Sequence, residues 1–258
     1  MRGMPELQAF IFEENKRFMK KVAILVDGGF YRKVAALYWG KKTPQSRAEE
    51  LISYCRKHLL DRGNYTVDKN NHHEYSRNDL YRIYYYDCPT ISKVLYHPLL
   101  QKNIDLSKNP TYQWMLDFIE SLRHQRKLAL RLGILADSTA CYSLKSEPTK
   151  KLLSGRIQIS DLTESDFELN IRQKGVDMKI GIDIASLAYK KQVDQIVLIS
   201  GDSDFVPAAK LARREGIDFI LDPMGTHITS ELEEHIDGLQ SYYKWNIGNT
   251  ITKREDSN

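Results

Sequence analysis

The chain has 258 residues, of which 41% are hydrophobic and 28% charged, and its formal net charge is +4. This balance is typical of a folded globular protein, and no stretch approaches the ~20 apolar residues that span a bilayer. Residues 1–20 carry too many charges for a secretory signal peptide. These features predict a cytoplasmic protein of one large or two small domains, with no membrane partner.

Charge is distributed unevenly along the chain. Residues 1–156 hold 27 Lys and Arg against 16 Asp and Glu, whereas residues 157–258 hold 11 against 18. A basic part can hold a phosphate backbone electrostatically. An acidic part would repel that backbone unless divalent cations neutralise it. The asymmetry suggests a polyanionic partner, and ordinary solvated surface is the alternative.

The cysteines and histidines form no recognisable metal-binding pattern. No CxxC pair occurs among Cys55, Cys88 and Cys141, which disfavours a zinc ribbon or a disulfide framework. The pair His72–His73 lies in a polar run, residues 64–78, that we expect to be a solvated loop.

The first half of the chain after an N-terminal leader (residues 1–20) predicts two strands and two helices. Each strand ends in an aspartate. The first, VAILVD, is a short apolar run closed by two glycines, and the second, LYRIYYYD, is rich in aromatic residues. Apolar residues with helical spacing follow the first strand as far as Gly40, and again after Ser46 as far as Gly63.

The second half predicts a regular alternation of strands and helices. One helix is expected over 109–130, and residues 130–160 contain short β-like pieces between polar breaks. The last third predicts, in order, a helix over 178–191, a strand over 194–200, a helix over 205–215, a strand over 216–222 and a helix over 228–236. Such alternation favours parallel pairing through right-handed crossovers, with all strand carboxyl ends at one edge, where ligands bind.

Aspartates collect at this predicted edge. They follow strands or begin helices in distant segments, and they are Asp27, Asp87, Asp177, Asp202 and Asp204. Asp222 follows the last strand, and we expect it to be structural. Asp183 lies about 600° round the helix from Asp177, off its face, and is expected as an additional partner.

Helix capping is the alternative explanation for three of these residues. Asp202 or Asp204 could be the N-cap of the helix at 205, and Asp177 could cap its own helix. Only one of the first two can be the cap, so the other carboxylate needs a different role. Crowded carboxylates repel one another unless a cation compensates. Oxygen ligands without thiolates favour Mg²⁺ or Mn²⁺, which can activate water against a phosphodiester.

Four segments, VDGGFY, YYYD, QKGVDMKIGIDIASLA and LISGDSDFVPAAKLARREGI, together resemble the NYN domain family, specifically its LabA-like bacterial branch. The resemblance covers roughly 21–236, loosely over 88–165. It implies a PIN-like three-layer α/β/α sandwich with a mainly parallel sheet, and Mg²⁺- or Mn²⁺-dependent RNA cleavage. On this resemblance the metal-binding and catalytic acids fall on Asp27, Asp177, Asp202 and Asp204, with Asp183 and Asp87 as further candidate ligands.

The resemblance also implies the domain organisation. We expect a single NYN domain over 21–240 with a variable insertion at about 88–165, and a C-terminal tail over 241–258. One position departs from the eukaryotic branch of the family, which carries an asparagine three residues after the first aspartate. Here that position is Phe30, an aromatic residue that LabA-like members often share, so the level of activity is the property that it affects.

Basic residues near aromatic residues could hold single-stranded RNA. The segment 121–156 is basic and lies near Tyr112, Trp114 and Tyr142, although we favour the core for Trp114. We expect substrate contacts from Lys174, Lys179, Arg126, Lys127 and Arg131. The sequence leaves a homo-oligomer or a protein partner open.

Two other functions compete with a ribonuclease. One is a regulator that keeps the fold and binds RNA or protein without turnover. The other is a phosphatase of the haloacid dehalogenase type. That chemistry needs a second aspartate two residues after the nucleophile, and Gly29 occupies this position. An intact acid quartet favours the ribonuclease over a regulator without turnover, and we take the ribonuclease to be an endonuclease.

Overall fold

A six-stranded sheet forms the centre of the computed structural model, which describes residues 19–67 and 73–244. Most of the expected leader and tail lie outside the described residues. The strand order is β12-β11-β10-β1-β4-β7, and every neighbouring pair is parallel, which confirms the predicted parallel sheet. The strands are β1 Lys21–Asp27, β4 Asp79–Asp87, β7 Leu128–Leu132, β10 Gln195–Ile199, β11 Asp218–Asp222 and β12 Gly238–Leu239.

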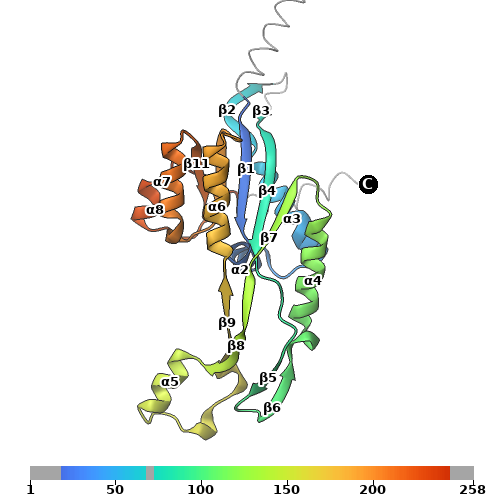
Figure 1. Cartoon of the computed structure of the whole chain (residues 1–258), viewed down its shortest axis with the longest axis vertical. Helices are drawn as coiled ribbons and strands as arrows, with labels where there is room; N and C mark the ends of the chain where they lie inside the picture. The colour runs from blue at the N-terminus through green and yellow to red at the C-terminus, as the bar shows by residue number, and fades with distance from the viewer. Residues whose placement is uncertain (1–18, 68–72, 245–258) are drawn as a thin grey trace, which may run out of the picture.

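Helices cover both faces of the sheet, so the fold is the predicted three-layer sandwich (Figure 1). One layer contains α2 Gly28–Trp39, α3 Pro44–Lys57 and α4 Pro110–Arg123, and the other contains α6 Val176–Tyr189, α7 Val206–Arg214 and α8 Ser230–Glu234. Alternate residues of β1 point to opposite layers: Ile24 joins the first core and Leu25 the second. Because both faces are buried, β1 is apolar from Val22 to Val26 and then reaches Asp27.

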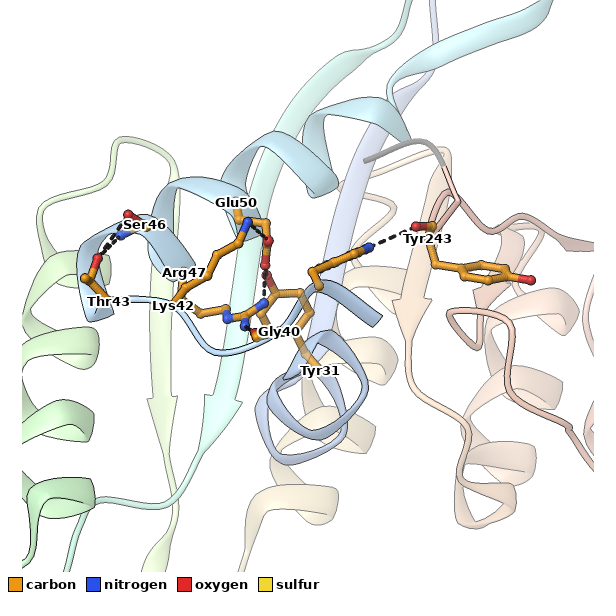
Figure 2. Close-up of polar contacts among 9 residues, drawn as sticks. Tyr31, Gly40, Lys42, Thr43, Ser46, Arg47, Glu50 and Tyr243 are labelled. Carbon is orange, nitrogen blue, oxygen red and sulfur yellow. Dashed lines mark hydrogen bonds and ion pairs between the residues drawn. The ribbon is translucent and has the colours of Figure 1, made fainter. Parts of the chain in front are cut away.

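A buried ionic cluster fixes α3 against the end of α2 (Figure 2). The Glu50 carboxylate accepts hydrogen bonds from the Tyr31 hydroxyl at 3.1 Å, from Lys42 Nζ at 2.5 Å and from Arg47. Arg47 also donates to the carbonyl oxygen of Gly40, the residue after α2. Two cations and a hydroxyl thus compensate the buried carboxylate. Without such partners a buried charge would be strongly destabilising.

An extension that we call the arm, residues 88–109 and 133–175, projects beyond the edge where β1 and β4 end (Figure 1). It contains two antiparallel pairs, β5 Val94–His97 with β6 Lys102–Asp105 and β8 Ile134–Leu144 with β9 Phe167–Lys174. It also contains α5 Ser146–Leu153 and the short turns η1 Leu106–Lys108, η2 Ile159–Asp161 and η3 Glu164–Asp166. A small separate core of Leu95, Leu106 and Ala140 holds these pairs together.

The arm does not form one continuous insertion over 88–165. Helix α4 and strand β7 lie within that range and belong to the sandwich, since α4 packs in its core and β7 pairs with β4. The helix predicted over 109–130 is confirmed over 110–123 and wrong over 124–130. Helix α4 ends at Arg123, and Lys127 adopts a positive φ of 60° in the turn before β7.

The loop predicted over 64–78 is also wrong where the structure describes it. Strands β2 Leu60–Val67 and β3 His73–Arg77 form an antiparallel pair, and residues 68–72 lie outside the described residues. Strands that satisfy each other's backbone groups outside the main sheet need no long apolar run, which was the signal used for strands. Within the described chain, no helix is both long enough and apolar enough to cross a membrane.

Candidate metal centre

Asp27 stands where the central strand β1 ends and helix α2 begins. It is the N-cap of α2, and its Oδ1 accepts a hydrogen bond from the backbone N–H of Phe30 at 3.1 Å. Its Oδ2 lies 3.4 Å from the hydroxyl of Ser200, the residue that follows β10. Parallel pairing of Val26 with Ile199 brings these two strand ends together. The first predicted site residue therefore lies at the carboxyl edge of the sheet.

The turn after Asp27 packs tightly against β4. A Cβ atom at Gly28 would lie 2.5 Å from the Tyr85 ring and 2.6 Å from Asp87 Oδ2. Only glycine leaves room for this approach, which sets the direction in which the chain leaves β1. The ring of Phe30 fills a second gap, since a Cβ atom at Gly201 would lie 3.0 Å from its Cε2 atom.

The other three acids of the predicted quartet lie at the starts of helical segments. Asp177 is in the first turn of α6, after Gly175, which has a φ of 81°. Asp202 is the N-cap of the short turn η4 Ser203–Phe205 and accepts from the N–H of Asp204 at 3.0 Å. Capping thus accounts for Asp202 but not for Asp204, whose side chain is exposed in that turn.

Electrostatic repulsion connects these carboxylates. Burial raises the pKa of Asp27, and the negative charges of Asp177 and Asp87 raise it further. The hydrogen bond from the Phe30 N–H acts in the opposite direction and lowers this pKa. Burial also raises the pKa of Asp177, and the charges of Asp202 and Asp204 add to it. Three segments distant in sequence therefore deliver four acids to one neighbourhood, in which negative charge is unfavourable.

The donor chemistry of this neighbourhood fits a hard divalent cation. All four groups are carboxylates, the ligands that Mg²⁺ and Mn²⁺ prefer, and a cation would relieve their repulsion. Across residues 19–67 and 73–244, however, no three Asp, Glu, His or Cys side chains lie close enough together to form a coordination shell. The carboxylates would have to move towards a bound ion.

Asp87 is occupied by a different partner, which argues against its role as a metal ligand. Arg32 donates to it through Nε at 2.9 Å and Nη2 at 3.0 Å. The Tyr85 hydroxyl and the N–H of Cys88 also donate to it, each at 2.8 Å. A carboxylate with a bidentate guanidinium partner is already compensated. We therefore assign Asp87 to the support of the edge.

Asp183 is likewise engaged by other side chains. Its Oδ2 accepts from the Tyr86 hydroxyl at 2.8 Å and from Arg131 Nε at 2.9 Å. Arg131 also lies over the Tyr84 ring, 5.1 Å from its centroid. This agrees with the expectation that Asp183 does not share a face with Asp177. It also means that Arg131 is tied to α6 in this structure, and Asp183 is a poor metal ligand.

The predicted basic contacts divide between the two edges of the sheet. Arg126 and Lys127 precede β7 and so lie at its amino edge, opposite Asp27, where Lys127 bonds to the carbonyl oxygen of Leu80. These two residues lie away from the candidate site, so the structure does not bring them together with the four acids. Lys179 does lie at the carboxyl edge, donating to the Leu132 carbonyl oxygen at 2.7 Å, and Lys174 ends β9 with an exposed side chain.

Sequence reasoning missed Arg32 and Ser200. Arg32 lies on α2 five residues after Asp27, where a basic side chain is usually solvated, and its pairing with Asp87 needs the fold to bring α2 beside β4. Ser200 is fully buried, and its place directly after the apolar strand β10 was an available signal. Asp222 is structural as expected, because it accepts from Tyr54, His58, Met224 and Ser241.

The fold and the site define a class of protein: a three-layer α/β/α sandwich with acidic residues at the carboxyl edge of its sheet. The family model of the NYN domain matches residues 101–237, more than half of the chain. The chain belongs to the NYN domain family, which is associated in general with nuclease activity, and its architecture agrees with a PIN-like fold.

Two further comparisons add no functional information. No curated protein matches the sequence. A solved structure of a protein of unknown function from Vibrio parahaemolyticus RIMD 2210633 matches 86% of this chain and 93% of its own, with 14% identity and a TM-score of 0.43. A likeness at this level supports no conclusion.

Proposed function

We propose that this chain is a metal-dependent ribonuclease of the LabA-like branch of the NYN family, a cytoplasmic endonuclease that hydrolyses single-stranded RNA. The observation that carries the proposal is the position of Asp27, Asp177, Asp202 and Asp204 at strand and helix ends of the carboxyl edge. The charge of Asp177 raises the pKa of Asp27, and the charges of Asp202 and Asp204 raise that of Asp177. Protein folding does not favour such crowding by itself, so a bound cation explains why the four acids stand together.

The four acids would hold Mg²⁺ or Mn²⁺, and the ion would supply an activated water and charge stabilisation for phosphodiester hydrolysis. The chain's own groups orient these ligands. The N–H of Phe30 and the Ser200 hydroxyl fix the two oxygens of Asp27. Lys174 and Lys179 flank Asp177 in sequence and are suited to hold a phosphate.

RNA is the proposed substrate because of the family and the surrounding charge. The arm, which projects beyond the acidic edge, carries the basic residues Lys145, Lys150, Lys151 and Arg156. A phosphate backbone crossing the edge would meet cations on the arm and metal ions at the acids.

A non-catalytic regulator that binds RNA or protein is the second candidate. Two observations favour it: the described carboxylates do not form a ready coordination shell, and Phe30 stands where an amide could assist catalysis. Such a protein would keep the fold and the arm without turnover.

Cleavage assays separate the two candidates. Labelled single-stranded RNA and DNA of one sequence are incubated with the protein in Mn²⁺, in Mg²⁺ and in EDTA. The proposal expects RNA fragments with either metal and none in EDTA. Intact RNA that is bound by folded protein in all three conditions would favour the regulator. Cleavage that persists in EDTA would contradict a metal mechanism.

A further inference from the structure

A cavity of about 360 Å³ lies where α4 meets the arm, beside the candidate metal centre. Its walls come from three parts of the chain. Helix α4 supplies Tyr112, Trp114 and Met115, and the arm strand β9 supplies Leu169 and Ile171. The loop after β4 and the Arg32–Asp87 ion pair close the remaining side. The volume lies at the lower end of the range for small-ligand sites.

The aromatic and cationic walls of the cavity are held in place. The Trp114 ring stacks on Phe118 at 5.1 Å with planes 17° apart, and its Nε1 donates to the Lys42 carbonyl oxygen at 2.9 Å. Arg32 is fixed by its two hydrogen bonds to Asp87. A preformed site of this kind costs a ligand little reorganisation.

The cavity approaches the acidic edge at Asp27, through Asp87. This residue lines the cavity, and its Oδ2 lies 2.6 Å from the position that a Cβ atom of Gly28 would occupy. Gly28 directly follows Asp27 in the chain. A ligand in the cavity is therefore separated from the acidic edge only by the end of β4 and the first turn of α2.

We propose that this cavity binds one unpaired nucleobase of the RNA strand whose phosphate lies at the acidic edge; this inference rests on the proposed function. A base has a flat apolar face and a polar rim. Tyr112 and Trp114 offer aromatic surface, and Leu169 and Ile171 offer aliphatic surface in the same cavity. Polar groups for the base edge come from Asn109, Thr90 and Thr111 at the same cavity. Splayed bases on aromatic side chains are how proteins commonly read single-stranded RNA.

A pair of matched substitutions tests the cavity. Leu169→Trp places an indole ring at the cavity wall. Leu169 is 37% exposed, so the arm has room for the larger side chain. Leu153→Trp makes the same change on α5, outside the cavity, at a side chain that is 82% exposed. Folding of both variants is checked by circular dichroism and by Tm.

The first readout is binding of adenosine 5′-monophosphate and of ribose 5-phosphate, titrated by NMR in EDTA. The proposal expects the nucleotide to bind wild type and Leu153→Trp alike. The nucleotide should bind Leu169→Trp about tenfold more weakly than it binds wild type. Ribose 5-phosphate should bind wild type about tenfold more weakly than the nucleotide does. Absence of nucleotide binding to folded wild type, or equal binding to both variants, would overturn the proposal.

The second readout uses a short single-stranded RNA with one abasic residue at each position in turn. Wild type should lose about tenfold in affinity at one position, and Leu169→Trp should bind the intact and abasic strands alike. If RNA cleavage in Mn²⁺ is unaffected by Leu169→Trp and by the abasic residue, the cavity does not bind a base of the substrate. The proposed hydrolysis would still stand. Base-dependent binding without cleavage would support the cavity and overturn the hydrolysis.

Discussion

Gly28 shows how a single residue sets the geometry of the site. Substitution by alanine would force a Cβ atom against the Tyr85 ring and Asp87, both fully or almost fully buried. We expect Gly28→Ala to lower the free energy of unfolding by about 1–3 kcal/mol, as overpacking does, measured by urea denaturation. Gly181 is the control, because a Cβ atom there meets nothing within 4 Å inside α6.

Gly181→Ala should instead leave stability unchanged or raise it by about 0.5–1 kcal/mol, since alanine is the better helix former. Equal losses of stability in the two variants would contradict the steric explanation.

Asp222 is the residue on which a second group of buried side chains converges. Its carboxylate is fully buried and accepts from Tyr54 at 2.6 Å, His58 at 2.8 Å and the N–H of Met224 at 2.7 Å. Asp222→Ala leaves these donors without an acceptor, so we expect a loss of about 3 kcal/mol in denaturant unfolding. Asp117→Ala, on the exposed face of α4, should cost less than about 1 kcal/mol. Similar losses in both would contradict this role of Asp222.

At the scale of the elements, the Arg32–Asp87 pair joins α2 to the end of β4. Arg32→Ala leaves a carboxylate that is 2% exposed without its cation. We expect a cost of about 2 kcal/mol, below the usual 3–5 for a buried pair because Arg32 is itself partly exposed. The double variant with Asp87→Asn should recover part of this loss. Strict additivity of the two single variants would show that the pair is not coupled.

At the scale of the whole molecule, metal binding should stabilise the fold. Mn²⁺ at about 100 times its Kd would contribute about 2.7 kcal/mol and raise Tm by several degrees. Asp202→Asn should remove most of this gain, and Asp117→Asn should keep it. Without metal, Asp177→Asn should have a higher Tm than wild type because it removes a repelling charge. No metal-dependent shift in wild type would contradict the proposed centre.

Sequence alone predicted the sandwich well where both sheet faces are buried. β1 and β10 are continuous apolar runs followed by polar residues, so their type, direction and carboxyl ends could be inferred. The arm could not be predicted. Strands β8 and β9 pair with each other and bury only one small core around Leu106, so their hydrophobic pattern is weak.

The candidate site was predictable only in part, for a related reason. Strand ends and helix starts identified Asp27 and Asp177 as edge residues. The pattern could not show that Asp87 is compensated by Arg32, or that Asp183 is held by Arg131, because these pairs join segments distant in sequence. For the same reason the sequence pattern could not show that Lys127 lies at the amino edge, away from the four acids.

The most direct test of the acidic edge as a catalytic metal centre is cleavage of labelled single-stranded RNA in Mn²⁺ by wild type, Asp27→Asn and Asp117→Asn. Substitution of a residue that hydrogen-bonds to a metal ligand typically lowers activity about 10–100-fold, and loss of the ligand itself should cost more. We therefore expect the cleavage rate of Asp27→Asn to be about 100-fold or more below that of wild type. Asp117→Asn should cleave like wild type. Equal cleavage by Asp27→Asn and wild type, with both folded, would contradict the account.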